Sequence, residues 1–271
     1  MKILFIGDIV GKPGRALIRS AVPRLVAKFE IDLVVANVEN AAGGNGITRE
    51  IGETIRDHGI DVMTTGNHVW DKREALDYIE IEPRLIRPAN FPQGAPGSGH
   101  VIAQSRGGDS VAVINVMGRV FMAPLDNPFA VVRDAIATVR EEARVIFVDF
   151  HAEATSEKIA MGWHLDGHVT AVVGTHTHVQ SADERVLPAG TAYITDVGMT
   201  GPHDSVIGVD KQVVLKRFLT GMPGRFETAS GDPRLHGVIV TANADTGRAT
   251  GIERLSLTSA DIEAVSRGTT T

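Results

Sequence analysis

Short apolar runs typical of β-strands alternate with amphipathic helical stretches along most of this 271-residue chain. Such alternation predicts an α/β protein in which parallel strands are joined by helices. The predicted strands of this kind cover residues 2–7, 33–37, 61–66, 144–150 and 169–174. We expect a layered β-sheet core flanked by helices, with a single domain over residues 1–260 and a loosely ordered tail over residues 261–271.

Turn and capping residues predict two antiparallel hairpins and the ends of one helix. Residues 100–118 predict a hairpin that turns at Gly107-Gly108, and the run that begins at residue 237 predicts another that turns at residues 245–247. The stretch TREIGETIRDHG predicts a helix with Thr48 as its N-cap and Gly59 as its end.

Composition excludes several classes of function. The chain has no cysteine, which excludes disulfides and thiolate metal sites and favours the cytoplasm. Its net charge of −6 argues against stable binding to duplex nucleic acid or to anionic membranes. No apolar run reaches the roughly 18–20 residues of a membrane span, and MKILFIGDIV is interpreted as a strand rather than a signal peptide. An anionic small substrate is compatible with this charge if bound metals invert the local field.

The stretch GDIVGKPGR resembles a phosphate-binding loop only superficially. Such a loop requires G-x-x-x-x-G-K followed by Ser or Thr, so that backbone amides surround a phosphate. Here Gly7 and Gly11 are one position too close, and Pro13 stands where the hydroxyl is needed. The functional residue of this stretch is therefore expected to be Asp8.

Polar side chains follow the ends of five predicted strands. Taken alone, each has an ordinary explanation: Asp8 as a cap or turn residue, and the GNH sequence at 66–68 as a turn. The His-x-His pattern is more informative, because it brings two imidazoles near one point. Since the carboxyl ends of parallel strands share one edge of a sheet, these residues are expected to converge there. They are Asp8, Glu39, Asn40, Asn67, His68, His151, His176 and His178.

The donor types predict the metal chemistry. Carboxylates, amides and imidazoles without sulfur suit Mn²⁺, Fe or Zn²⁺, and imidazole makes Mg²⁺ less favoured. Seven candidate ligands are too many for one tetrahedral ion but fit two ions that share a carboxylate. Two metals about 3.5–4 Å apart can activate a bridging hydroxide and hold a phosphoryl group. The residues alone therefore predict a phosphoester hydrolase with two metal ions per chain.

Longer motifs resemble those of a known family. The segments FIGDIVGKPGR, NVENAAGGNGIT, TTGNHVWD, DFHAEATSEK, GTHTHVQSADERVLPAGTAYITDVGMTGP and DSVIG are similar to the bacterial 2′,3′-cyclic-nucleotide 2′-phosphodiesterases, a branch of the calcineurin-like metallophosphoesterases. The resemblance runs from residue 1 to about residue 257. It implies the calcineurin-like fold and a 2′,3′-cyclic nucleotide as substrate.

The resemblance also implies roles for the residues at the strand ends. Glu39 would bridge two metals, with Asp8, Asn40 and His178 on the first and Asn67, His151 and His176 on the second. His68 occupies the position of the catalytic histidine, which protonates or stabilises the leaving oxygen. The superfamily's usual Asp-x-His is missing, because Ile9 and Val10 follow Asp8. An amide oxygen from Asn40 in place of that imidazole makes the first site harder, which favours Fe or Mn over Zn.

Two other functions stay open from the residues. One is a phosphatase or phosphodiesterase that acts on another small phosphoester or on an RNA end. The other is a non-catalytic regulatory protein that keeps a metal site. The loop over residues 198–208 is expected either to cover the cleft, with His203 near the substrate, or to be an ordinary surface loop. A homo-oligomer is compatible with the sequence.

Overall fold

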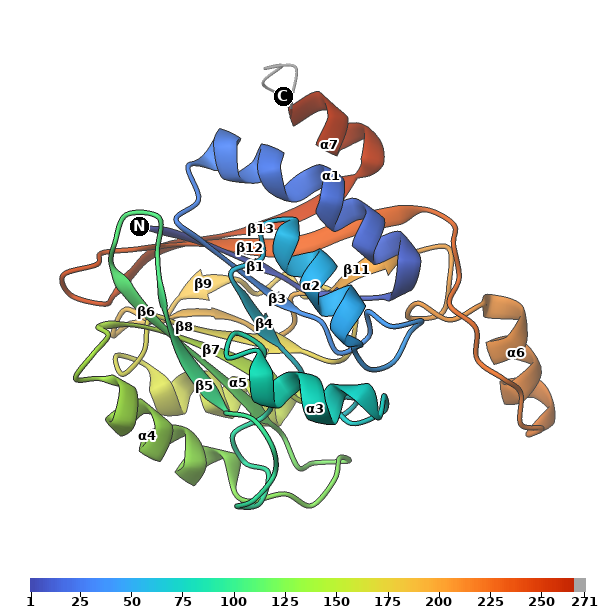
Figure 1. Ribbon diagram of the computed structural model, residues 1–271, viewed down its shortest axis with the longest axis horizontal. Helices are drawn as coiled ribbons and strands as arrows, with labels where there is room; N and C mark the ends of the chain where they lie inside the picture. Colours follow the sequence, from blue (N-terminus) through green and yellow to red (C-terminus); the bar gives the residue numbers. More distant parts are fainter. Residues whose placement is uncertain (266–271) are drawn as a thin grey trace.

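Two β-sheets packed face to face form the centre of the molecule (Figure 1). The computed structural model describes residues 1–265. Within that range the first sheet has seven strands, in the order β2-β11-β12-β1-β3-β4 with β13 also paired to β12. These strands are β1 (Lys2–Ile6), β2 (Asp8–Ile9), β3 (Leu33–Asn37), β4 (Val62–Thr64), β11 (Met199–Pro202), β12 (Pro233–Ala242) and β13 (Ala249–Thr258).

The second sheet has six strands within the described range, in the order β5-β6-β7-β8-β10-β9. Strands β6, β7, β8 and β10 run parallel to one another, as do β1, β3 and β4 in the first sheet. The strands of the second sheet are β5 (His100–Gln104), β6 (Ser110–Met117), β7 (Val145–His151), β8 (Ala171–Thr175), β9 (Arg185–Val186) and β10 (Ala192–Ile194).

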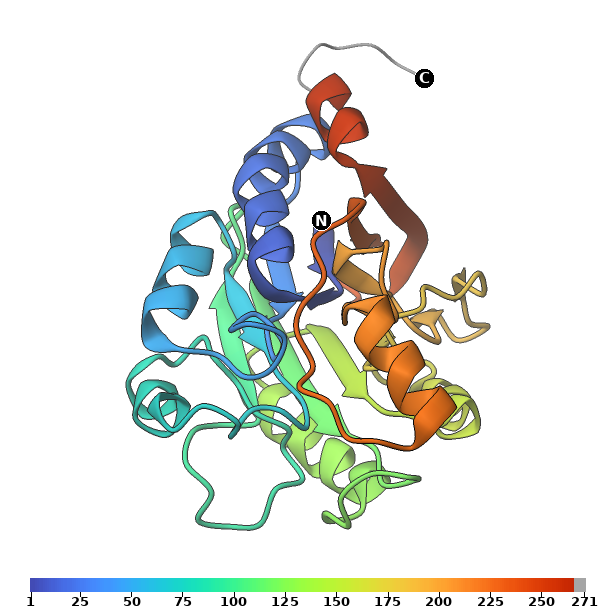
Figure 2. The same ribbon diagram turned by 90° about the vertical axis from the view of Figure 1, so that its right-hand side faces the viewer.

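Helices cover the outer face of each sheet, which gives four layers. Side chains of α1 (Gly11–Phe29), α2 (Arg49–Asp57), α3 (Glu74–Ile81) and α7 (Ser259–Val265) pack with the first sheet. Those of α4 (Pro128–Val139) and α5 (Thr155–Leu165) pack with the second. The remaining helix, α6 (Lys211–Thr220), projects from the body, and the segment after it runs across this end of the molecule (Figure 2). No helix in the described part of the chain is long and apolar enough to cross a membrane.

The alternation of side chains along the strands explains the layers. In β1, Ile3 and Phe5 face the second sheet, whereas Leu4 and Ile6 pack against the helices. The ring of Phe5 stacks on Phe147 of β7, with ring centroids 5.5 Å apart. Because both faces of each sheet are covered, the central strands are continuously apolar instead of alternating with polar residues.

The predicted hairpins and the N-cap of α2 are confirmed. Strands β5 and β6 pair antiparallel, as do β12 and β13. The Thr48 hydroxyl accepts from the Ile51 amide at 3.4 Å. The stretch GKPGR forms the start of α1.

Two expectations need correction. The expected layered core is present, but the strands that deliver the polar residues are divided between its two sheets and do not share the edge of one parallel sheet. Residues 261–265 lie in α7 instead of a loose tail, since Ile262 is buried against the first sheet's helical layer. The rest of the expected tail, residues 266–271, lies outside the described residues.

Gly7 allows the close approach that places Asp8 in the interior. It joins β1 to β2, and β2 pairs with β11, where Met199 lies opposite Asp8. A Cβ on Gly7 would overlap the carbonyl oxygen of Gly198. The backbone around residues 7 and 198 therefore leaves no room for a side chain.

We expect Gly7→Ala to lower the free energy of unfolding by about 1–3 kcal/mol, the usual range for overpacking. Gly251→Ala in β13 is the matched control, because a Cβ there meets nothing within 4 Å. Urea denaturation of both variants measures the difference. Equal stability of the two variants would show that the contact between residues 7 and 198 does not constrain the fold.

Candidate metal centre

The structure gathers the polar residues of five chain segments at one end of the two sheets. Asp8 lies in β2, Glu39 and Asn40 follow β3, and Asn67 and His68 follow β4. From the second sheet, His151 ends β7, and His176 and His178 follow β8. All eight side chains singled out from the sequence therefore lie around one point, although they span 171 positions of the chain.

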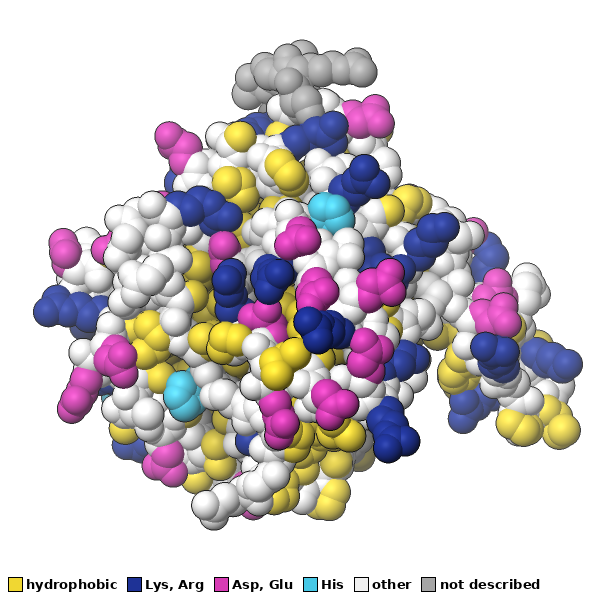
Figure 3. Space-filling view, in the orientation of Figure 1, with side chains coloured by type: hydrophobic (Ala, Val, Ile, Leu, Met, Phe, Trp, Pro, Cys, Tyr) yellow, Lys and Arg dark blue, Asp and Glu magenta, His cyan; other side chains and the backbone are white. Residues whose placement is uncertain are grey.

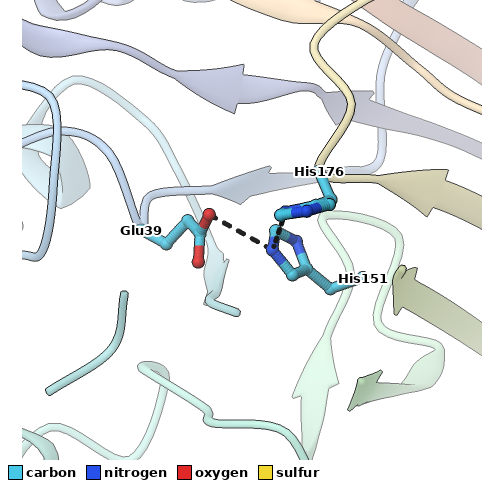
Figure 4. A group of neighbouring side chains, drawn as sticks. All are labelled: Glu39, His151 and His176. Atoms are coloured by element: carbon cyan, nitrogen blue, oxygen red, sulfur yellow. Dashed lines mark hydrogen bonds and ion pairs between the residues drawn. The ribbon is translucent and has the colours of Figure 1, made fainter. Parts of the chain in front are cut away.

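Glu39, His151 and His176 form the centre of this cluster (Figure 4). Glu39 Oε1 lies 3.2 Å from His151 Nε2, and His176 Nδ1 lies 3.1 Å from the same nitrogen. One donor atom from each residue lies within 4.8 Å of the others, a spacing that could hold a metal ion. Asn67 belongs to the same group, because its Oδ1 is 2.9 Å from His151 Nε2.

Asp8 and His178 belong to the same cluster, and Asp8 Oδ1 lies 4.0 Å from His151 Nδ1. The Oδ1 atom of Asp8 is 3.9 Å from His178 Nε2, and Asp8 Oδ2 accepts from the backbone amide of His176 at 3.3 Å. Asn40 Nδ2 donates to Glu39 Oε1 at 3.1 Å and lies 3.2 Å from His178 Nε2. These contacts join Asn40 to Glu39 and His178, and Asp8 to the loop that carries the two histidines.

Two observations test whether this cluster fits metal ions. Asp8 Oδ1 is fully buried and has no hydrogen-bond partner, an arrangement that is costly unless a cation satisfies it. Gly66 leaves open the space between Glu39 and His151, since a Cβ there would overlap Glu39 Oε2 and His151 Nε2. The donor set of carboxylate, amide and imidazole is also a suitable one. The residues present therefore fit bound metal.

Burial and the charges of neighbouring side chains shift the pKa values of the residues in this cluster. Burial raises the pKa of Asp8, while His178 and His151 lower it in part. Burial also works against the charge on Glu39, but the attraction and hydrogen bond of His151 lower the pKa of Glu39 to about 2. The pKa of His176 falls to about 3, because its ring is buried and lies beside His151. Burial alone would lower the pKa of His151, but Glu39 and Asp8 raise it to about 9, so the buried carboxylates favour a cation beside them.

A buried ion pair holds the loop that carries the two histidines. His176 and His178 adopt positive φ values of 100° and 65°, which are strained for residues with a side chain. Thr177, between them, donates its backbone amide and its hydroxyl to Asp196 Oδ2, at 3.1 and 2.6 Å. Lys158 of α5 donates to the same oxygen at 2.6 Å. These contacts fix both imidazoles relative to β8.

His68 lies beside the cluster and faces a cleft of about 430 Å³. Its backbone amide donates to Glu39 Oε2 at 3.0 Å, and its Nδ1 lies 2.8 Å from Asp71 Oδ2. Asp71 therefore orients the ring and leaves Nε2 available to a bound molecule. Asp71 was not among the site residues expected from the sequence. It follows His68 by three positions within TTGNHVWD, and this spacing could have indicated a partner for the histidine.

The loop over residues 198–208 has two separate surroundings. Ile207 and Gly208 line the cleft, and the Ile207 carbonyl accepts from His178 Nδ1 at 2.9 Å. His203 does not line it but lies in a different cavity of about 660 Å³. Its ring packs on His236, with ring centroids 4.5 Å apart, so of the two alternatives left open for His203 the structural one fits this contact.

Residues after α6 complete the cleft and were missed from sequence. Phe226, Glu227 and Thr228 line it together with the histidines. Arg217 of α6 lies over the Phe226 ring, 5.0 Å from its centroid. Their segment follows no strand and carries no motif, so spacing alone gave no signal for it.

Comparisons with known proteins found relatives that match nearly the whole chain. The model of the YmdB-like protein family matches residues 4–255. A 2′,3′-cyclic-nucleotide 2′-phosphodiesterase of Bacillus subtilis is 51% identical over 94% of this chain and 96% of its own length. A hypothetical protein of Thermus thermophilus has a crystal structure with a TM-score of 0.89 and 41% identity, covering 95% of this chain and 99% of that one.

A second solved structure is also similar over nearly the whole chain. A novel phosphatase of Mycoplasma pneumoniae superposes with a TM-score of 0.89 at 34% identity, covering 95% of this chain and 93% of its own. Since the family model and these relatives each span nearly the whole chain, the protein belongs to the YmdB-like protein family.

Proposed function

We propose that this chain is a phosphodiesterase that hydrolyses 2′,3′-cyclic nucleotides to 3′-nucleotides at a centre of two metal ions. The observation that carries the proposal is the convergence of Asp8, Glu39, His151, His176 and His178 next to the cleft that His68 faces. The substrate class is taken from the Bacillus subtilis relative, which is named for this activity. The fold that accompanies it is the calcineurin-like metallophosphoesterase fold.

The residues divide into two ligand groups around a shared carboxylate. Glu39 would serve both ions, with Asp8, Asn40 and His178 on the first and Asn67, His151 and His176 on the second. Asn40 would bind through its amide oxygen, which requires the amide to turn over from the orientation in which Nδ2 faces Glu39 and His178. Oxygen ligands on the first ion favour Fe or Mn, and Zn or Mg are weaker alternatives.

Bound metal ions would supply Lewis-acid stabilisation of phosphoryl charge and a nucleophile from water at neutral pH. The chain's own residues do the remaining work. Hydrolysis forms a bond from phosphorus to the water oxygen and breaks the bond from phosphorus to O2′, which must gain a proton. His68 would provide that proton from Nε2 in its imidazolium form, in which Nδ1–H donates to Asp71, and the ring is neutral after the transfer.

The cleft suits a small nucleotide. Its volume of about 430 Å³ lies in the range of small-molecule sites. Phe226 offers an aromatic face at its edge, a surface on which a nucleobase of any sequence can stack. On the face of the molecule shown in Figure 3, cationic and anionic side chains are interspersed, an arrangement unlike the one-sided basic surface that binds duplex nucleic acid.

Two alternative functions would use part of the same site. Hydrolysis of another phosphoester or of an RNA end would use the same metal centre, and a regulatory protein would bind metal without turnover. The His68–Asp71 pair at the cleft favours catalysis over regulation. The cytoplasmic location and the homo-oligomer stay predictions.

The direct test is the identity of the product. Protein loaded with Mn²⁺ or Fe is incubated with 2′,3′-cyclic AMP, and the products are separated by chromatography. We expect 3′-AMP, with the reaction abolished after chelation and restored by added metal. Formation of 2′-AMP would contradict the proposed bond cleavage. Absence of hydrolysis by protein verified to carry two metals would exclude this substrate.

We expect His68→Ala to keep its bound metal and to lower turnover about 10²- to 10⁴-fold, the usual contribution of a general acid. His58→Ala is the matched control, since His58 lies at the end of α2 and outside the cleft lining. Metal content by elemental analysis and turnover with the cyclic nucleotide are measured for both. Loss of metal from His68→Ala would assign His68 to metal binding instead.

A further inference from the structure

A buried chain of hydrogen bonds begins at Nδ1 of His151, the ring nitrogen that also lies 4.0 Å from Asp8 Oδ1. The Nδ1 atom of His151 is 2.9 Å from Thr175 Oγ1, and the Thr175 hydroxyl donates to Asp149 Oδ1 at 2.7 Å. All three residues are fully buried. The chain connects β7 to β8 in the second sheet, at the point where both strands end.

The direction of these hydrogen bonds follows from counting protons. The Thr175 hydroxyl has one proton, which it gives to Asp149, so toward His151 it can only accept. The Nδ1 atom of His151 must therefore carry a proton. The other ring nitrogen, Nε2, faces Glu39, Asn67 and His176.

Asp149 is held as an acceptor by residues of the first sheet. Its Oδ2 accepts from the Thr64 hydroxyl and, at 3.2 Å, from Asn37 Nδ2. The amide oxygen of Asn37 accepts in turn from the backbone amide of Glu39 at 3.1 Å. One buried carboxylate thus connects the chain segments of Glu39 and His151 across the two sheets.

We propose that Asp149 and Thr175 are positioning residues that keep a proton on Nδ1 of His151 and so leave Nε2 as its metal-binding atom. This inference rests on the proposed function, because it assigns the outer hydrogen bonds of one of its metal ligands. A ligating histidine needs its second ring nitrogen engaged in this way, since the partner fixes both tautomer and ring orientation. Here the partner is a hydroxyl instead of a direct carboxylate or carbonyl.

The first measurement uses the unaltered protein. Protein labelled with ¹⁵N-histidine and loaded with diamagnetic Zn²⁺ is studied by NMR, and the His151 signals are assigned by their loss in His151→Gln. We expect a slowly exchanging proton on Nδ1 and none on Nε2. A proton on Nε2 and none on Nδ1 would mean that Thr175 donates to His151, and this result would overturn the proposal.

The second measurement is the Zn²⁺ affinity of three variants, determined by competition with a chelating dye. Thr175→Val removes the hydroxyl at constant shape, and we expect it to weaken binding about 10- to 100-fold, as loss of such a partner does elsewhere. Thr175→Ser restores the hydroxyl and is expected to restore the affinity.

Thr170→Val is the matched structural control. Thr170 directly precedes β8, is fully buried, and donates its hydroxyl to the Gly247 carbonyl at 2.6 Å. It should lose stability as Thr175→Val does, yet keep the unaltered affinity. The proposal is overturned if Thr175→Val and Thr175→Ser bind Zn²⁺ with equal affinity. It is also overturned if Thr170→Val loses as much Zn²⁺ affinity as Thr175→Val does.

These readouts involve no substrate, so they separate the inference from the proposed function. If the protein binds metal as described but does not hydrolyse the cyclic nucleotide, the proposed function fails and the positioning role stands. If Thr175→Val does not fold, the proton position in the unaltered protein decides the question alone.

Discussion

The face-to-face packing of the two sheets is the constraint on which the candidate site depends. Glu39 and Asn67 come from the first sheet, whereas His151 and His176 come from the second, so the donor cluster exists only where the ends of β3, β4, β7 and β8 coincide. The contact between Phe5 and Phe147 belongs to the apolar layer that fixes this alignment. A shift between the sheets would therefore separate the donors of the first sheet from those of the second.

The site also explains why the protein tolerates so many buried polar groups. Asp8, Glu39, Asp149 and Asp196 are all buried, and desolvation of a carboxylate is costly without compensation. Asp196 is compensated by Lys158, and Asp149 by hydroxyl and amide donors from both sheets. Asp8 Oδ1 has no such partner, and bound metal would provide it. Asp196 in turn holds the strained loop of His176 and His178 through Thr177.

The sequence predicted the parts of this arrangement that follow from strand ends. Asp8, Glu39 and His151 each follow or end an apolar strand, and parallel strands bring such residues together without further information. It could not predict which strand belongs to which sheet of the layered core, because apolar runs look alike in either sheet. It also could not place His203, whose packing on His236 depends on β12, or Phe226, which lies in a segment without periodicity. Residues 261–265 form a helix because Ile262 finds a buried position, which is a tertiary effect.

The most direct test of this account is the location of the metals. Crystals soaked in Mn²⁺ would be measured at the manganese absorption edge, and anomalous difference maps would show the ions without reference to activity. The account predicts two peaks about 3.5–4 Å apart on either side of Glu39, as in other two-metal sites. One peak is expected beside Asp8 and His178, and the other beside His151 and His176. A single peak, or peaks away from Glu39, would contradict a two-metal centre that shares this carboxylate.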